Sequence, residues 1–148
     1  MKEILFRAKT SSEVNGFNRK KDGLWVYGFY RDKVGLPTIS EFDTSVADYI
    51  DYEVDRRTIC QFTGLTDKNG TKIFEGDIVR GKDYGGLRRE GVVEYDKYTA
   101  GYNIVPKTKS EYRECSIITS LSPAEEYLEI IGNIYDNYYL LRGYDVKD

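Results

Sequence analysis

The chain has 148 residues, a net charge of −3 and 40% hydrophobic residues, which together describe one globular domain or two small ones. It contains no histidine, and this excludes the commonest general base near neutral pH and the imidazole zinc site. No apolar run approaches the roughly 20 residues of a membrane span. The negative net charge argues against strong, purely electrostatic binding of nucleic acid.

Two features place the protein in the cytoplasm of its host cell. The charges within residues 1–7 interrupt the apolar core that an export signal needs. The two cysteines, Cys60 and Cys115, lie far apart without a CxxC spacing, which is typical of ordinary thiols in a reducing compartment. We therefore expect a cytoplasmic protein that does not contact a membrane.

The N-terminal part predicts two strands, at residues 4–8 and 24–30, separated by a polar and basic loop at residues 15–23. Gly28 within the second strand indicates a bulge or a close backbone approach. Trp25, Tyr27 and Phe29 alternate along that strand, and we expect them to face the core.

Residues 34–57 are ambiguous. A short strand fits residues 38–40, and residues 45–53 fit a helix, a strand or an irregular connection. The segment 34–60 carries six acidic residues against two basic ones. We expect the boundary between two parts here, with an N-terminal β segment at residues 1–57 and a second domain at residues 58–148.

The second part predicts short strands joined by tight turns, at residues 58–63, 78–80, 91–95, 101–105 and 117–119. Asn69-Gly70 indicates a tight turn because both residues tolerate positive φ, and Glu75-Gly76-Asp77 indicates another. Residues 81–90 hold three glycines and predict a flexible loop. Ser122-Pro123 is typical of a helix start; residues 128–135 then favour a strand and residues 136–141 a short helical turn.

Several blocks of this sequence, in this order, resemble the YopX family of phage and prophage proteins. The closest are QFTGLTDKNG at residues 61–70 and IFEGDIV at residues 73–79; the others are residues 1–8, 25–28, 52–55, 91–93 and 131–137. Cys60 and Tyr138 depart from the family pattern, which has a small residue and proline there. The resemblance implies a mainly β protein with an SH3-like β-barrel from about residue 58 onward, a phage or prophage origin, and self-association as a homo-oligomer. It implies no enzymatic activity, cofactor or substrate.

One stretch suggests a binding surface. Arg80, Lys82, Arg88 and Arg89 surround Tyr84, and basic residues interleaved with an aromatic can hold phosphate and stack a base. A mobile loop without a ligand is the simpler interpretation. The basic run 19–21 is interpreted as a solvated loop, with a nucleic-acid or partner contact as the alternative.

The candidate catalytic residues are few. Glu75 and Asp77 form a carboxylate pair that a small hydrolase or metal site can use, but their place in a tight turn favours binding of backbone donors. Asp67 to Gly70 do not form a calcium loop, because Leu65 and Gly76 fall where oxygen ligands are required. We therefore predict a non-enzymatic binding module without metal or cofactor, which acts through a protein partner or self-association; a nucleic-acid-binding module that uses residues 80–89 is the alternative.

Overall fold

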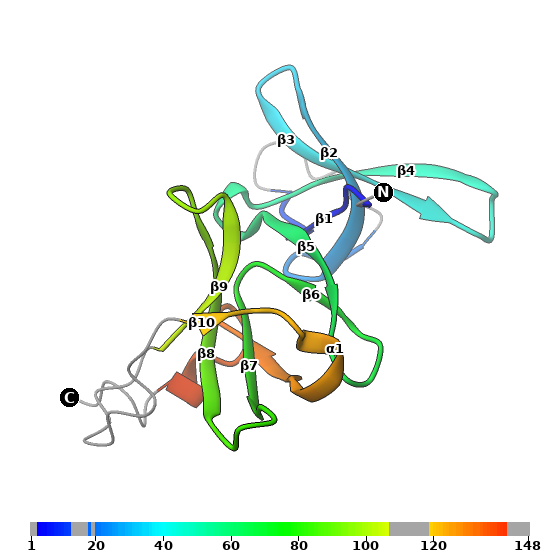
Figure 1. Cartoon of the computed structure of the whole chain (residues 1–148). Coiled ribbons are helices and arrows are strands. Elements are labelled where there is room, and N and C mark those ends of the chain that lie inside the picture. The colour runs from blue at the N-terminus through cyan, green and yellow to red at the C-terminus, as the bar shows by residue number, and fades with distance from the viewer. Residues whose placement is uncertain (1–2, 13–17, 19, 107–118, 142–148) are drawn as a thin grey trace. The chain divides into compact units, whose positions relative to one another are not determined.

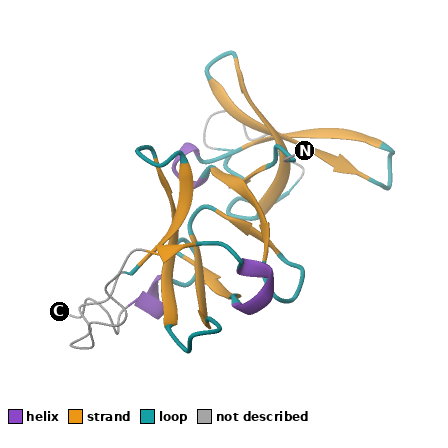
Figure 2. Cartoon of the chain, in the orientation of Figure 1, coloured by secondary structure: helices purple, strands orange, loops and turns teal. Residues whose placement is uncertain are grey.

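The computed structural model describes residues 3–12, 18, 20–106 and 119–141, and the protein is mainly β, as predicted (Figures 1 and 2). Arg19, Cys115 and residues 117–118 lie outside the described residues. The chain divides into two compact units, Met1–Phe62 and Thr63–Asp148, and each is described separately below. None of the helices within the described ranges is long and apolar enough to cross a membrane.

The first unit holds four antiparallel strands in the order β4-β3-β2-β1, followed by the first residues of a fifth strand. These elements are β1 (Phe6–Lys9), β2 (Trp25–Lys33), β3 (Leu36–Asp43), β4 (Asp48–Glu53), the 3₁₀ turn η1 (Arg56–Thr58) and the start of β5 (Cys60–Thr66).

The long strand β2 changes partner at Gly28. Its first half pairs with β1, where Phe6 lies opposite Gly28, and its second half pairs with β3, where Phe29 lies opposite Ser40. A Cβ atom on Gly28 would lie 1.9 Å from the Ser40 carbonyl oxygen, so only glycine lets the two backbones approach this closely. This confirms the close backbone approach predicted at Gly28.

The core of the first unit lies on the face of β2 opposite to the one predicted. Val26 is fully buried, whereas the exposed fractions of Tyr27 and Phe29 are 42% and 56%. The prediction that the alternating aromatics face the core is therefore wrong. The reason is that the partners of β2 place their small and β-branched residues on the other face, where Ala8 lies opposite Val26 and Ile39 opposite Tyr30.

The ambiguous segment after β2 forms the hairpin β3–β4. The register runs from Thr38 opposite Glu53 to Asp43 opposite Asp48. Val34 and Gly35 join β2 to β3, and both have positive φ, which is the conformation of a two-residue type I′ turn. The strand expected at residues 38–40 is confirmed, and residues 48–53 form a strand rather than a helix.

The second unit contains an open, antiparallel five-stranded sheet in the order β10-β9-β8-β7-β11. The elements of the second unit after β5 are, in chain order, β6 (Lys72–Phe74), β7 (Asp77–Lys82), β8 (Arg88–Asp96), β9 (Gly101–Val105), β10 (Thr119–Ser120), the one-turn helix α1 (Ala124–Tyr127), β11 (Glu129–Asn133) and the 3₁₀ turn η3 (Tyr138–Leu141). Of the strands, β6 pairs with β5 and lies outside the five-stranded sheet. The strand and helical turn predicted after residue 128 are both confirmed. The described strands do not close into a barrel, and the SH3-like barrel stays a prediction.

The central strands β7 and β8 are buried on both faces. Ile78 and Val92 lie opposite each other and pack against Leu141 from η3. Val79 and Val93 face the other way, into a cluster that also contains Leu128. The core of this unit therefore consists of two hydrophobic clusters, one on each face of the β7–β8 hairpin.

Asp67 connects the turn after β5 to β11. One carboxylate oxygen, Oδ1, accepts the backbone N–H groups of Asn69 and Thr71, each at 2.9 Å, and the other accepts that of Ile130 at 3.1 Å. Gly70 has a φ of +80° and donates its N–H to the Asp67 carbonyl, which confirms the predicted turn. The side chain is 3% exposed, so these bonds compensate the burial of a carboxylate.

We expect Asp67→Ala to lower the free energy of unfolding by about 1.5–3 kcal/mol, the range for hydrogen bonds to a charged group. Asp67→Asn keeps an acceptor for the turn but presents an amide N–H₂ to the N–H of Ile130, so we expect a smaller loss. Urea unfolding of the three proteins measures both values. An Asp67→Ala protein as stable as the wild type would contradict this role.

Gly91 on β8 and Gly101 on β9 form a matched pair for a second test. A Cβ atom on Gly91 would lie 2.4 Å from the Val105 carbonyl oxygen, whereas the nearest atom to one on Gly101 is 3.9 Å away. We expect Gly91→Ala to destabilise the protein by about 1–3 kcal/mol through overpacking and Gly101→Ala to change stability by about 0.5 kcal/mol or less. Equal effects of the two substitutions in thermal unfolding would contradict the close approach at Gly91.

Candidate binding site at the end of the β7–β8 hairpin

The predicted basic loop is mostly a regular hairpin. Residues 80–82 and 88–90 are paired strand positions, with Arg80 opposite Glu90 and Lys82 opposite Arg88. Only residues 83–87 form a turn, in which Asp83 Oδ1 accepts the N–H groups of Gly85 and Leu87, each at 3.0 Å. The prediction of a flexible loop over residues 81–90 is therefore wrong at both ends, because cross-strand pairing outweighs the glycine content.

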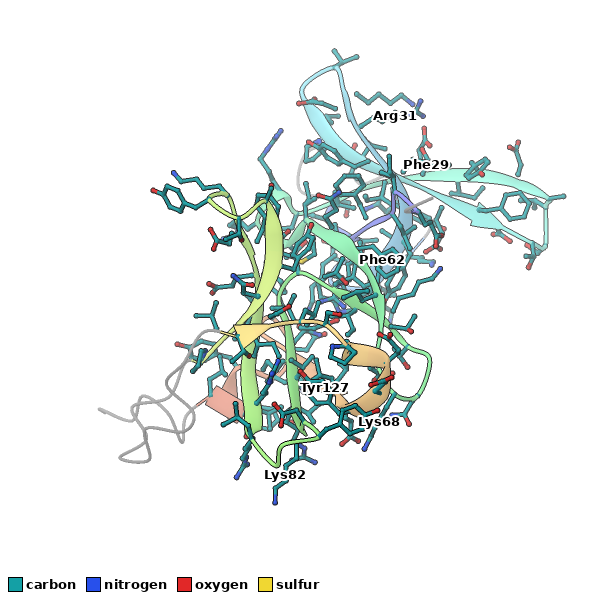
Figure 3. All side chains as sticks on the ribbon, in the orientation of Figure 1. Phe29, Arg31, Phe62, Lys68, Lys82 and Tyr127 are labelled. Atoms are coloured by element: carbon teal, nitrogen blue, oxygen red, sulfur yellow. The ribbon has the colours of Figure 1, made fainter. Side chains whose placement is uncertain are left out.

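An open depression of about 430 Å³ lies at the end of this hairpin, beside α1. Figure 3 labels three residues around it, Lys68, Lys82 and Tyr127, which come from three separate elements. Its lining residues are Lys68, Arg80, Gly81, Lys82, Arg88, Glu126, Tyr127 and Glu129. Three of the five predicted contact residues, Arg80, Lys82 and Arg88, thus line one surface.

Four of the lining residues were not indicated by the sequence, namely Lys68, Glu126, Tyr127 and Glu129. Lys68 is brought to the depression by its backbone N–H, which donates to the Leu128 carbonyl at 2.8 Å. Tyr127 ends α1, and its carbonyl oxygen would lie 2.2 Å from a Cβ on Gly81. Glycine at position 81 is therefore what lets α1 lie close to the hairpin.

Arg89 does not line the depression. Its guanidinium donates to the Tyr127 hydroxyl at 3.0 Å and to the Ser120 carbonyl at 3.2 Å, and it pairs with Asp83 at 3.0 Å. Burial raises the pKa of the Tyr127 hydroxyl, and the nearby Arg89 charge partly opposes this shift. Arg89 therefore joins the hairpin to α1 and the segment before it, rather than presenting its charge to a ligand.

Tyr84 lies on the turn with 85% of its surface exposed. A hydrogen bond to the Glu126 carboxylate raises the pKa of its hydroxyl. The ring is therefore accessible on the turn, and Tyr84 is not one of the residues that line the depression. Of the five predicted residues, Tyr84 is the one whose aromatic surface is available for stacking.

The depression carries more positive than negative charge. Four cations line it, against the carboxylates of Glu126 and Glu129. Arg80 lies 3.8 Å from Glu129, and Arg88 pairs with Glu90 at 2.8 Å, but both arginines keep more than half of their side-chain surface exposed. An excess of cations around a concave surface attracts anionic groups.

The other candidate residues have structural partners. Asp77 is 2% exposed and accepts the N–H of Phe74 at 2.8 Å, in the turn role predicted for it. Lys20 pairs with Glu41 at 2.7 Å, and this hydrogen bond raises the pKa of Lys20. Cys60 is buried and its thiol donates to the Thr58 carbonyl. In the part of the chain that the structure describes, no three cysteine or acidic side chains meet in a group that could hold a metal ion.

The fold and this surface define a small, mainly β protein with an open basic depression suited to an anionic group. A model of the family described as YopX protein matches residues 5–142, nearly the whole chain. The chain belongs to the YopX family, as its sequence blocks indicate. No curated protein sequence matches it.

The contacts of Arg89 predict a structural role that can be separated from ligand binding. We expect Arg89→Ala to lower the free energy of unfolding by about 1–3 kcal/mol, since Tyr127, Ser120 and Asp83 lose a charged partner. Arg89→Lys should restore only part of this, because an ammonium group cannot make the three contacts of the planar guanidinium. Lys82→Ala is the control, with an expected change of about 0.5 kcal/mol or less. Chemical denaturation distinguishes these variants, and a stable Arg89→Ala protein would contradict the assignment.

Proposed function

We propose that this YopX family protein is a phage- or prophage-encoded, non-enzymatic binding module of the bacterial cytoplasm, and that it holds an acidic segment of a partner protein. The observation that carries the proposal is the set of four cations around one open depression. The family resemblance to phage and prophage proteins supports the setting, and the buried turn role of Asp77 removes one of the two carboxylates that a hydrolase would use.

The cations differ in how readily they can bind a ligand. Among the described residues, no carboxylate forms an ion pair with Lys68 or Lys82, and both side chains belong to exposed residues. The pair between Arg80 and Glu129 is at the surface, where an ion pair contributes about 1 kcal/mol or less. The carboxylate that Arg88 binds, Glu90, is buried, so Arg88 keeps this pair and offers only the exposed part of its side chain. A carboxylate of a partner can therefore replace Glu129 at Arg80, and the arginine fork can then bind it through two hydrogen bonds.

A nucleic acid is the second candidate ligand, and Tyr84 favours it. This ring is exposed on the turn that joins the paired residues Lys82 and Arg88, so a base stacked on it could place its phosphates near these two cations. The net charge of −3 weakens long-range attraction to a polyanion. For this reason we propose the acidic protein segment, rather than a nucleic acid, as the ligand.

Fluorescence anisotropy of the full chain with three labelled probes tests both candidates at about 50 and 200 mM salt. The probes are a peptide of alternating glutamate and serine, a single-stranded DNA or RNA oligomer, and a DNA duplex. We expect the acidic peptide to bind, and the double variant Lys68→Ala/Lys82→Ala to weaken its binding about tenfold, since two charged contacts are lost. Lys97→Ala, at an exposed lysine on the β8–β9 turn, is the control and should leave binding unchanged.

The outcomes separate the candidates. Steeply salt-dependent binding of the single strand that weakens in Tyr84→Ala would favour the nucleic-acid function over the acidic segment. Binding of any probe that the double variant leaves unchanged would exclude this depression as its site. If no probe binds at low salt, both candidates fail.

A further inference from the structure

A second surface, which belongs to the first unit, is built by the edge strand β4. This strand pairs with β3 on one side, and within the described residues no strand pairs along its other side (Figure 1). An edge strand presents a row of backbone donors and acceptors that another chain can use. The proposed function does not involve this surface, so the two can be tested independently.

Asn18 closes one end of this edge. Its amide oxygen accepts the N–H of Glu53 at 2.9 Å, and its amide nitrogen donates to the Glu53 carbonyl at 2.9 Å. Ser11 also donates its backbone N–H to the same carbonyl, at 2.9 Å. The side-chain amide thus supplies the donor and acceptor that a neighbouring strand would supply, and the edge is open only before Glu53.

The contact between Asn18 and Glu53 shows which backbone groups of β4 face away from β3. Successive residues of a strand direct their N–H and C=O groups to alternate sides, so those of Tyr49 and Asp51 face outward as those of Glu53 do. The N–H of Tyr49 donates to Asp48 Oδ1 at 2.7 Å. The N–H of Asp51 has no hydrogen-bond partner among the described residues, which leaves a donor available at the centre of the open edge.

An exposed aromatic cluster lies beside the open edge. The rings of Phe29 and Phe42 lie 5.7 and 5.2 Å from that of Tyr49, centroid to centroid. All three residues are at least half exposed. Phe42 and Tyr49 are a cross-strand pair, so a strand added outside β4 would extend this aromatic face by one more side chain. Exposed apolar patches of this kind mark interaction sites.

The charges of β4 determine what such a strand must carry. The strand carries Asp48, Asp51 and Glu53 and has no lysine or arginine. Asp51 is paired with Arg31 and Lys33 of β2, whereas Asp48 lies opposite another carboxylate, Asp43. An antiparallel pairing with β4 of a second copy would bring these carboxylates together, and like charges on facing strands are destabilising. The ligand is therefore a strand with a basic residue near Asp48 and Asp43 and an apolar residue opposite Tyr49.

We propose that the outer edge of β4 binds an extended, basic and apolar segment of a partner protein by strand addition, over the stretch from Asp48 to Asp51. Backbone hydrogen bonds with the C=O of Tyr49 and with the N–H and C=O of Asp51 provide the pairing. The aromatic cluster and the carboxylates select the side chains.

The test is an NMR titration of the ¹⁵N-labelled full chain with the blocked peptide Thr-Lys-Val-Ile-Lys-Thr, and with Thr-Glu-Val-Ile-Glu-Thr as the control peptide. We expect the basic peptide to shift the amide signals of residues 49–51 and to slow exchange of the Asp51 N–H. The control peptide should bind at least about tenfold more weakly, because it places carboxylates opposite carboxylates.

Two substitutions at position 51 distinguish the contribution of the backbone N–H to peptide binding from that of the side chain. Asp51→Ala and Asp51→Pro both lose the contacts with Arg31, Lys33 and Ser40, but only proline removes the N–H. Proline is tolerated at an edge strand when its nitrogen faces solvent. We expect the alanine variant to bind within about tenfold of the wild type and the proline variant not to bind.

Phe42→Ser provides a variant with an unchanged β4 backbone, should proline disturb the strand, and we expect it to weaken peptide binding. Equal binding to Asp51→Ala and Asp51→Pro would overturn strand addition. Equal binding of the two peptides would overturn the charge selection. Concentration-dependent shifts of residues 49–51 without any peptide would identify a second copy as the occupant and overturn the proposed ligand.

Discussion

The carboxylate of Asp67 accepts three backbone N–H groups, two from its own turn and one from Ile130, which lies 63 residues further along the chain. This buried group sets the conformation of the turn after β5 and at the same time fixes the start of β11. The neighbouring residue Lys68 is then bound to Leu128 through its backbone N–H, and Lys68 is one of the residues that line the depression. The charge of the candidate site thus depends on a polar contact in the interior of the second unit.

Local chemistry accounts for the parts of the structure that could be predicted from the sequence. Gly70 has the positive φ that its turn requires, and Gly28 lies where two backbones approach closely. The strand at residues 101–105 and the strand and helical turn after residue 128 follow from side-chain type and spacing within a few residues. In each of these places the preference of the segment agrees with its tertiary surroundings.

Features that depend on distant partners could not be predicted. The face of β2 that is buried is decided by Ala8 and Ile39 on its neighbours, and not by its own larger aromatics. The turn at Val34-Gly35 has positive φ at a β-branched residue, which sequence preferences oppose. The prediction of residues 80–89 as a contact surface could not indicate that Arg89 bonds to Tyr127, because the two meet only after α1 packs on the hairpin.

The amide of Asn18 covers Glu53 with a donor and an acceptor in a fixed arrangement, and this has a consequence for the ageing of the protein. Deamidation would convert Asn18 to aspartate and place a second carboxylate oxygen where the amide nitrogen now donates to the carbonyls of Ser11 and Glu53. The new carboxylate would still accept the N–H of Glu53, but it would repel the two carbonyl oxygens that the amide nitrogen now contacts. A single hydrolysis event, without any change in the encoded sequence, would therefore weaken the contact that covers this end of the edge strand, and exposed strand edges favour aggregation.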